Sequence, residues 1–164
     1  MPFELPENLH PNCAPLAWML GTWRGNGHGD YPTIEKFQYG QELIFTHDGR
    51  PFFHYMARSW IVDDEGNKVR DAAIETGFVR CQPEGKVEVL LVHSSGVAEI
   101  WYGTAGEGKL EITTDAIATT ETAKKVQAGH RLYGNVEGDL LYAYDMAAMD
   151  QALQPHLWAR LKRQ

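Results

Sequence analysis

The chain has 164 residues, of which 43% are hydrophobic and 23% are charged, and its formal net charge is -7. This length suits one domain with a substantial core, and the composition excludes a disordered chain. The acidic balance argues against a nucleic-acid partner, because only the short basic end formed by Arg160, Lys162 and Arg163 could offset phosphate repulsion.

Signals for export, membrane insertion and zinc binding are missing from the pattern. The start of the chain, residues 1–7, holds acidic residues and prolines where a signal peptide has a basic flank and an apolar run. No stretch approaches the roughly 20 apolar residues of a membrane span. Cys13 and Cys81 lack a second pair that would indicate a zinc site. We therefore expect a cytoplasmic protein without disulfides that does not associate with a membrane.

Two segments are predicted at the N-terminus. Residues 1–14 carry three prolines and little periodicity, which predicts an extended lead-in before a single β-barrel domain over residues 15–164. Pro15 suits the first turn of a short helix that continues through Leu20, and Gly21 would end it.

The next segment, residues 21–34, reads Gly-Thr-Trp-Arg-Gly-Asn-Gly-His-Gly-Asp-Tyr-Pro-Thr-Ile. Glycines at alternate positions of a strand indicate close backbone approach, bending or a bulge. We interpret this segment as the bent first strand of a small closed barrel, with Trp23 and Tyr31 in the core. The pattern alone is also compatible with a flexible glycine loop between two strands.

The rest of the chain alternates runs of β-forming residues with short turn signals, too short to hold crossover helices. The predicted strands are 37–46, 52–62, 69–80, 87–93, 97–102, 110–114, 119–128, 130–136 and 140–146. With the glycine-rich strand and a terminal strand, this gives an all-β, closed, antiparallel up-and-down barrel of about ten strands. Closure removes exposed edges and leaves room for one small ligand.

The end of the chain, residues 152–164, has helical composition, but Pro155 and the alternation from His156 onward favour a strand that closes the barrel. The faces of that strand would be His156, Trp158 and Arg160 on one side, and Leu157, Ala159 and Leu161 on the other. The second face, if exposed, could support a homodimer; otherwise it would pack against the N-terminal helix.

Catalytic and metal-binding motifs are sparse. The chain has no Gly-x-Ser-x-Gly elbow, no His-Glu-x-x-His motif and no phosphate loop. No two of its seven histidines have the i, i+2 spacing that presents two imidazoles of a strand to one metal ion. This weakens a structural zinc site and makes a single histidine that ligates a haem iron, whose porphyrin supplies the other nitrogens, the more interesting option.

The glycine-rich segment resembles the signature of the nitrobindins, a family of haem-binding ten-stranded β-barrels similar in shape to lipocalins and fatty-acid-binding proteins. The resemblance continues through Glu75-Thr76-Gly77-Phe78, Ser95-Gly96-Val97-Ala98-Glu99 and Leu153-Gln154-Pro155-His156-Leu157. It covers nearly the whole chain from Leu16 onward.

This resemblance implies one ferric haem b per chain, bound non-covalently near the barrel mouth, with His156 as the only protein ligand to iron. It implies that Thr33 touches the haem. Met146 matches a pocket position, although it could be a plain core residue. His93 matches a polar distal position, although it could instead cap the turn at residues 94–96. The activity implied is isomerisation of peroxynitrite to nitrate, with reversible binding of nitric oxide.

One position departs from the family. Ala73 stands where members often carry a distal histidine, so we expect a more apolar distal side that alters ligand release. Two other functions stay open. One is a metal-free carrier of a fatty acid or another apolar molecule, anchored by Arg58 or Tyr144. The other is a structural domain whose partner is a protein.

Overall fold

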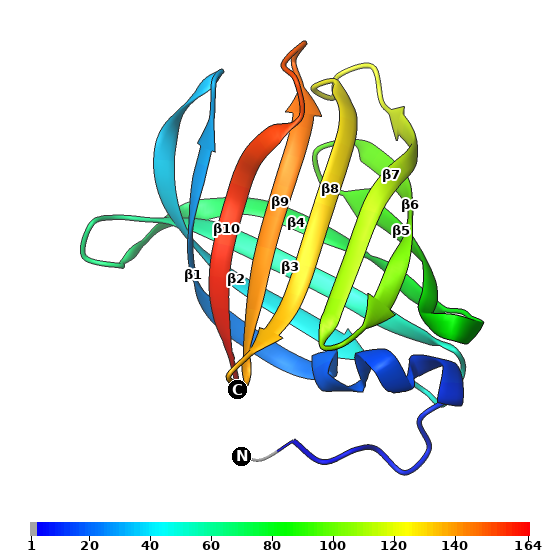
Figure 1. The fold of residues 1–164 in the computed structure, drawn as a ribbon. Helices are drawn as coiled ribbons and strands as arrows, with labels where there is room; N and C mark the ends of the chain where they lie inside the picture. Colours follow the sequence, from blue (N-terminus) through cyan, green and yellow to red (C-terminus); the bar gives the residue numbers. More distant parts are fainter. Residues whose placement is uncertain (1–2) are drawn as a thin grey trace.

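The computed structural model describes residues 3–164, so the first two positions of the expected lead-in lie outside the described residues. Ten antiparallel strands, each paired with the next and the last paired with the first, form a closed barrel (Figure 1). The strands are β1 (Gly21–Tyr31), β2 (Ile34–Thr46), β3 (Phe52–Val62), β4 (Lys68–Cys81), β5 (Lys86–His93), β6 (Val97–Gly106), β7 (Lys109–Thr119), β8 (Val126–Val136), β9 (Asp139–Ala148) and β10 (Gln154–Arg163). The predicted fold class is confirmed.

A 3-10 helix, η1 (Pro11–Met19), lies across one end of the barrel (Figure 1). It begins before Pro15, so the last residues of the expected extended lead-in are helical. The reason is a cap at His10, whose Nδ1 accepts a hydrogen bond from the Asn12 amide at 3.1 Å. A single turn of 3-10 helix, η2 (Pro83–Gly85), joins β4 to β5. Among the described residues, no helix has the length and apolar character needed to cross a membrane.

Trp23 and Tyr31 are core residues, as predicted. The Trp23 side chain is fully buried, and its indole Nε1 donates a hydrogen bond to the Met19 carbonyl at 2.8 Å, which ties η1 to the barrel. The Tyr31 hydroxyl accepts a hydrogen bond from the Ala148 amide at 2.8 Å and lies 3.0 Å from the Met146 carbonyl oxygen. These bonds join the end of β1 to the end of β9 across the barrel wall.

Two glycines of β1, Gly25 and Gly27, are required by close packing against β10. A Cβ on Gly25 would lie 2.2 Å from the Arg160 carbonyl oxygen, and one on Gly27 would lie 2.2 Å from the Trp158 carbonyl oxygen. No side chain fits at such distances without movement of the backbone. The segment is therefore a strand that packs closely against its neighbour, and the loop alternative is wrong.

We expect Gly25→Ala to lower the free energy of unfolding by about 1–3 kcal/mol, because the new methyl group must displace the β10 backbone. Gly134 in β8 is the matched control, since a Cβ there would meet no atom within 4 Å. Urea denaturation of both variants is the measurement. Equal stability of Gly25→Ala and Gly134→Ala would contradict the packing explanation.

One predicted strand is wrong. Residues 119–128 do not form a strand of their own, because β7 continues to Thr119 and β8 begins at Val126 and runs through residue 130. The threonine-rich stretch between them turns, with a hydrogen bond from the Ala123 amide to the Thr120 carbonyl at 3.2 Å. The β propensity of threonine is overridden here by the need to connect two antiparallel strands.

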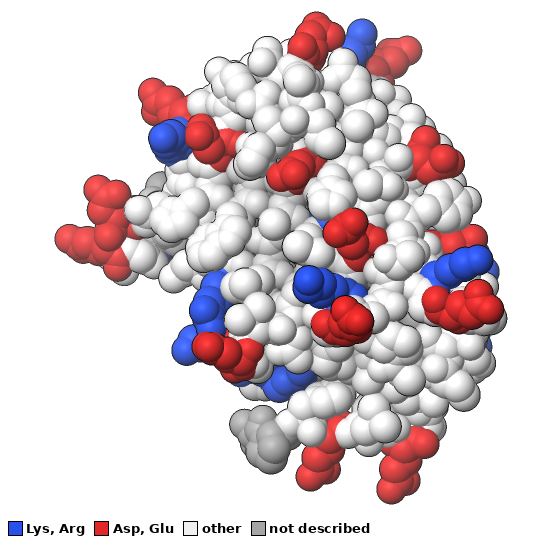
Figure 2. All heavy atoms as spheres, in the orientation of Figure 1, with Lys and Arg blue, Asp and Glu red and all other residues white. Residues whose placement is uncertain are grey.

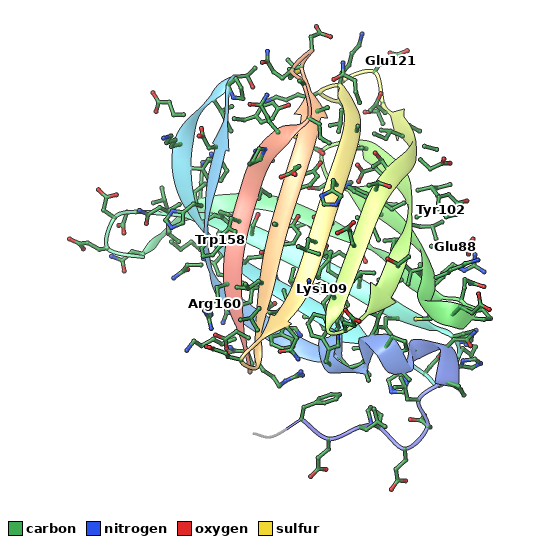
Figure 3. All side chains as sticks on the ribbon, viewed as in Figure 1. Glu88, Tyr102, Lys109, Glu121, Trp158 and Arg160 are labelled. Carbon is green, nitrogen blue, oxygen red and sulfur yellow. The ribbon has the colours of Figure 1, made fainter. Side chains whose placement is uncertain are left out.

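The terminal strand that closes the barrel is confirmed, and the structure decides between the two alternatives left open for its second face. Ala159 and Leu161 are fully buried in the core cluster that also contains Met19 of η1. Trp158 and Arg160 project outward instead (Figure 3). Of the two roles suggested for Ala159 and Leu161, packing with the N-terminal helix agrees with the structure, and these two residues offer no surface to a second copy.

Candidate functional site

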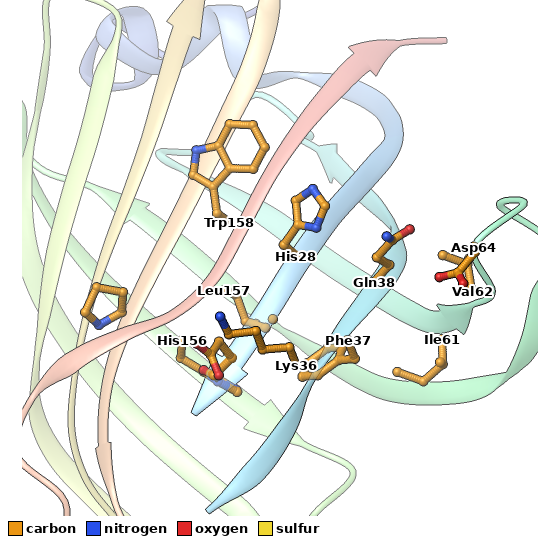
Figure 4. Close-up of a pocket in the computed structure, with 13 residues that line it drawn as sticks. His28, Lys36, Phe37, Gln38, Ile61, Val62, Asp64, His156, Leu157 and Trp158 are labelled. Atoms are coloured by element: carbon orange, nitrogen blue, oxygen red, sulfur yellow. The ribbon is translucent and has the colours of Figure 1, made fainter. Parts of the chain in front are cut away.

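A cavity of about 760 Å³ is lined mainly by residues of β2, β3 and β4, together with His156 and Leu157 of β10. This volume lies within the usual range of small-molecule sites. A neighbouring cleft of about 680 Å³, drawn in Figure 4, shares His156, Phe37 and Lys36 with the cavity. His156 is therefore exposed to both spaces.

A β-bulge sets the direction of the His156 side chain. The register between β10 and β9 shifts between Pro155 and Leu157, which interrupts the alternation of faces. The half-buried imidazole packs edge-on to Tyr31 at 5.3 Å and to Tyr144 at 5.8 Å between ring centroids. The predicted grouping of His156 with the outward side chains of β10 is wrong, because that prediction assumed an unbroken period of two.

A hydrogen bond fixes the tautomer of His156. Its Nδ1 lies 3.0 Å from the Asp30 carbonyl oxygen, which can only accept, so Nδ1 carries the proton and donates it. The other nitrogen, Nε2, makes no hydrogen bond to any described residue. Its lone pair is therefore available to a metal ion, and a backbone carbonyl on the remote nitrogen is the usual support for such a ligand.

Burial lowers the pKa of His156 below the ordinary histidine value, and the hydrogen bond to the Asp30 carbonyl offsets part of that shift. The Arg131 charge lowers the pKa further. Desolvation acts in this direction because it disfavours the imidazolium form. The side chain is therefore neutral at neutral pH, which is the form that coordinates metals.

This shift predicts a pH dependence of stability in the ligand-free protein. Between about pH 6.5 and the lower native pKa, the unfolded chain binds a proton at His156 that the folded chain does not. The free energy of unfolding should therefore decrease as the pH falls through this window. Urea denaturation at several pH values, compared with His156→Asn, is the measurement, and an identical pH profile for both proteins would contradict the shift.

The other predicted site residues fall into two groups. Ala73 lines the cavity together with His156. Thr33 lies exposed in the turn between β1 and β2, and Met146 packs partly buried against the core. His93 is hydrogen-bonded to the buried Glu99 carboxylate. None of these last three predicted residues lines the cavity or the cleft, and their roles toward a ligand stay predictions.

The anchors suggested for a lipid carrier are engaged elsewhere. Arg58 lines the cavity, but it is exposed and its Nε lies 3.2 Å from a Glu42 carboxylate oxygen. Tyr144 does not line the cavity and packs against the Arg131 guanidinium, whose central carbon lies 4.6 Å from the ring centroid. Tyr144 is therefore not placed to anchor a carboxylate in the cavity, and Arg58 already pairs with Glu42.

Sequence reasoning missed a buried ion pair below the cavity. Arg131 of β8 is 1% exposed and lies 2.6 Å from a carboxylate oxygen of Glu75, which lines the cavity. The guanidinium also lies over Trp101, 5.0 Å from the ring centroid. The one signal in the sequence is strand alternation, which places Arg131 on the same face as Tyr133, an aromatic residue that the structure buries.

Two polar groups at the cavity have no hydrogen-bond partner among the described residues. The hydroxyl of Tyr39 and Oε1 of Gln41 are buried without a hydrogen bond among the described residues, and both residues line the cavity. Burial raises the pKa of Tyr39, so its hydroxyl stays protonated and can donate. Buried polar atoms without partners indicate that the inner part of the cavity accommodates a polar group or water.

A single free imidazole nitrogen suits only some metal cofactors. Across residues 3–164, no group of three or more His, Cys, Asp or Glu side chains is placed to hold a metal ion. Haem needs only one protein ligand on its iron, because the porphyrin supplies the in-plane nitrogens. The cavity adds apolar walls from Phe37, Ile61 and Leu157, which suit a planar macrocycle.

Comparison with known proteins agrees with this fit. Residues 12–163 match the family model described as the THAP4-like, heme-binding beta-barrel domain. The chain is 74% identical to a peroxynitrite isomerase of Nocardioides sp. over 164 residues, with 100% of both chains covered. It is 43% identical to a ferric nitrobindin-like protein of Streptomyces griseus, covering 98% of this chain and 85% of that protein.

A solved structure shows the same fold. The crystal structure of Rv2717c from M. tuberculosis superposes with a TM-score of 0.83 at 37% identity, covering 95% of this chain and 99% of that chain. The resemblance to nitrobindins expected from the sequence is therefore confirmed. With a family model that spans nearly its whole length, the chain belongs to the THAP4-like heme-binding β-barrel family.

Proposed function

We propose that this protein binds one ferric haem b per chain in the cavity and isomerises peroxynitrite to nitrate. The observation that carries the proposal is His156, a neutral imidazole at the cavity whose Nδ1 is bound to the Asp30 carbonyl and whose Nε2 is free. The name of the Nocardioides relative, at 74% identity over the full length, supports the activity.

Two sets of residues would contact the haem: one would ligate the iron, and the other would pack against the macrocycle. His156 would ligate the iron through Nε2, and the Asp30 carbonyl holds the ring in the tautomer that leaves Nε2 unprotonated. Phe37, Ile61 and Leu157 line the cavity and would give the macrocycle an apolar surface to pack against. When bound, haem supplies a Lewis-acidic iron at which peroxynitrite can rearrange.

The test is peroxynitrite decay in the presence of protein loaded with ferric haem, followed by stopped-flow absorbance, with nitrate and nitrite measured at the end. We expect the decay rate to rise in proportion to protein concentration and the nitrate share to increase. His156→Ala mixed with the same concentration of haem is the control. Decay no faster than with that variant, or with free haem, would overturn the activity.

We also propose that nitric oxide binds reversibly at the same iron, with Ala73 on the wall of the cavity. A methyl group donates no hydrogen bond to a bound ligand. We therefore expect Ala73→His to slow nitric oxide release by about tenfold, because an imidazole N–H could stabilise the ligand. Flash photolysis and ligand-replacement kinetics give the rate, and an unchanged rate would show that residue 73 does not face the ligand.

A cytoplasmic location is part of the proposal. It is supported by Cys13 and Cys81, which are both buried and both free. Buried unpaired thiols are typical of proteins in a reducing compartment.

A further inference from the structure

The mouth of the cavity is lined by basic side chains from separate parts of the chain. Lys36 comes from β2, Arg58 from β3, Arg70 from β4 and Lys124 from the loop between β7 and β8. We propose that Lys36, Arg70 and Lys124, here called the basic rim, form a site that captures anionic groups entering the cavity.

The members of the basic rim are available to a ligand. Lys36, Arg70 and Lys124 are exposed, and none of them forms an ion pair within 4.0 Å among the described residues. Arg70 makes one weak hydrogen bond, to the Asp71 carbonyl at 3.4 Å. Arg58 is left out of the basic rim because it is already bound to Glu42.

The acidic side chains that line the cavity do not neutralise the positive charge of the basic rim. Glu75 is neutralised by Arg131 at 2.6 Å. Glu35 is the other acidic lining residue, so the three cations of the basic rim face one uncompensated carboxylate. Among the residues that line the cavity, basic side chains therefore outnumber uncompensated acidic ones.

This local charge opposes the charge of the whole molecule. The chain has 22 acidic and 15 basic residues, for a net charge of -7. Figure 2 shows acidic side chains spread over the visible face with basic ones among them. The molecule as a whole repels an anion, so basic side chains at the entrance would raise the rate at which an anion reaches the cavity.

The ligand chemistry is a small anion or a carboxylate. This inference rests on the proposed function, which supplies two sources of that chemistry: the peroxynitrite anion and the propionate carboxylates of haem. Attraction between exposed charges falls within a Debye length of about 10 Å at 0.1 M salt. Capture by the basic rim should therefore weaken as the ionic strength rises.

The first experiment uses the haem-free protein and does not depend on the proposed activity. The probes are anilinonaphthalene sulfonate, which is anionic, and Nile red, which is neutral. The variant is Lys36→Gln/Arg70→Gln/Lys124→Gln. The matched control is Lys86→Gln/Lys109→Gln/Lys162→Gln, which removes three exposed lysines that do not line the cavity and changes the net charge equally.

We expect the basic-rim variant to bind the sulfonate about tenfold more weakly than wild type at low salt, with Nile red binding unchanged and the control triple variant close to wild type. The difference should shrink at high salt. Equal loss of sulfonate binding in both triple variants would show an effect of net charge alone and would overturn the proposal, as would no loss in either.

The second experiment identifies the source of the anion in haem-loaded protein. Ferric protein is mixed with azide, an anionic iron ligand, and with imidazole, a neutral one, and haem release to apomyoglobin is measured. If the basic-rim variant binds azide more slowly than wild type, while its rates of imidazole association and haem release are unchanged, the basic rim captures the substrate anion. If the variant releases haem faster than wild type and its azide association is unchanged, the basic rim binds the haem propionates. If none of the three rates changes, the proposal that the basic rim captures an anion is overturned. If wild-type protein shows no haem spectrum, the proposed function alone is contradicted.

Discussion

Replacing His156 by alanine should weaken haem binding by more than about 100-fold. Loss of a group that only supports a metal ligand already costs 10–100-fold in affinity, and His156→Ala removes the ligand itself. Among the described residues, His156 is the one histidine that lines the cavity. Haem transfer to apomyoglobin, followed by absorbance, measures the loss.

His28→Ala is the matched control for this experiment. His28 lies one strand away on β1, where it is exposed and stacks on Trp158 at 6.3 Å between ring centroids. It lines the outer cleft with His156 but not the cavity. We expect wild-type haem retention for His28→Ala. If His28→Ala loses haem and His156→Ala retains it, the site lies in the cleft and the assignment of His156 is wrong.

Arg131→Met should cost about 3–5 kcal/mol of folding free energy. The guanidinium is 1% exposed, and its removal leaves the Glu75 carboxylate without its partner at 2.6 Å. Breaking a buried ion pair on one side is strongly destabilising because the remaining charge is not compensated. Denaturation in urea, with constant m-value as the check on two-state unfolding, measures the change.

The double variant Arg131→Met/Glu75→Gln separates the ion pair from simple packing. Removing both charges should recover most of the stability lost by the single variant, because no unpaired carboxylate remains. If the free energy of unfolding of the single variant falls by less than about 1 kcal/mol, or if the double variant is no more stable than the single one, an uncompensated Glu75 charge is not the cause of the destabilisation.

Much of the fold follows from the sequence because its signals are local. Turn residues separate short runs of β-formers, so the number of strands and their antiparallel order are predictable. The glycines at 25 and 27 signal close approach by their spacing, and the structure shows that approach against β10. The prediction of a strand at residues 119–128 is wrong because it also relies on a local signal: β propensity cannot distinguish a threonine-rich strand from a threonine-rich connection.

The site is less predictable because its parts are distant in the chain. The direction of His156 depends on a bulge between Pro155 and Leu157, and a bulge breaks the alternation on which the prediction relied. The partner of Arg131 is Glu75, 56 residues away, and no local pattern connects them. The basic rim draws on three separate elements, so it becomes visible only when the barrel closes.

The central claim is that one chain holds one haem through His156. Titration of the haem-free wild-type protein with ferric haem, followed by the Soret band, tests it most directly. The account predicts a shifted band that saturates at one equivalent of haem per chain. A spectrum that remains that of free haem at every ratio would contradict it.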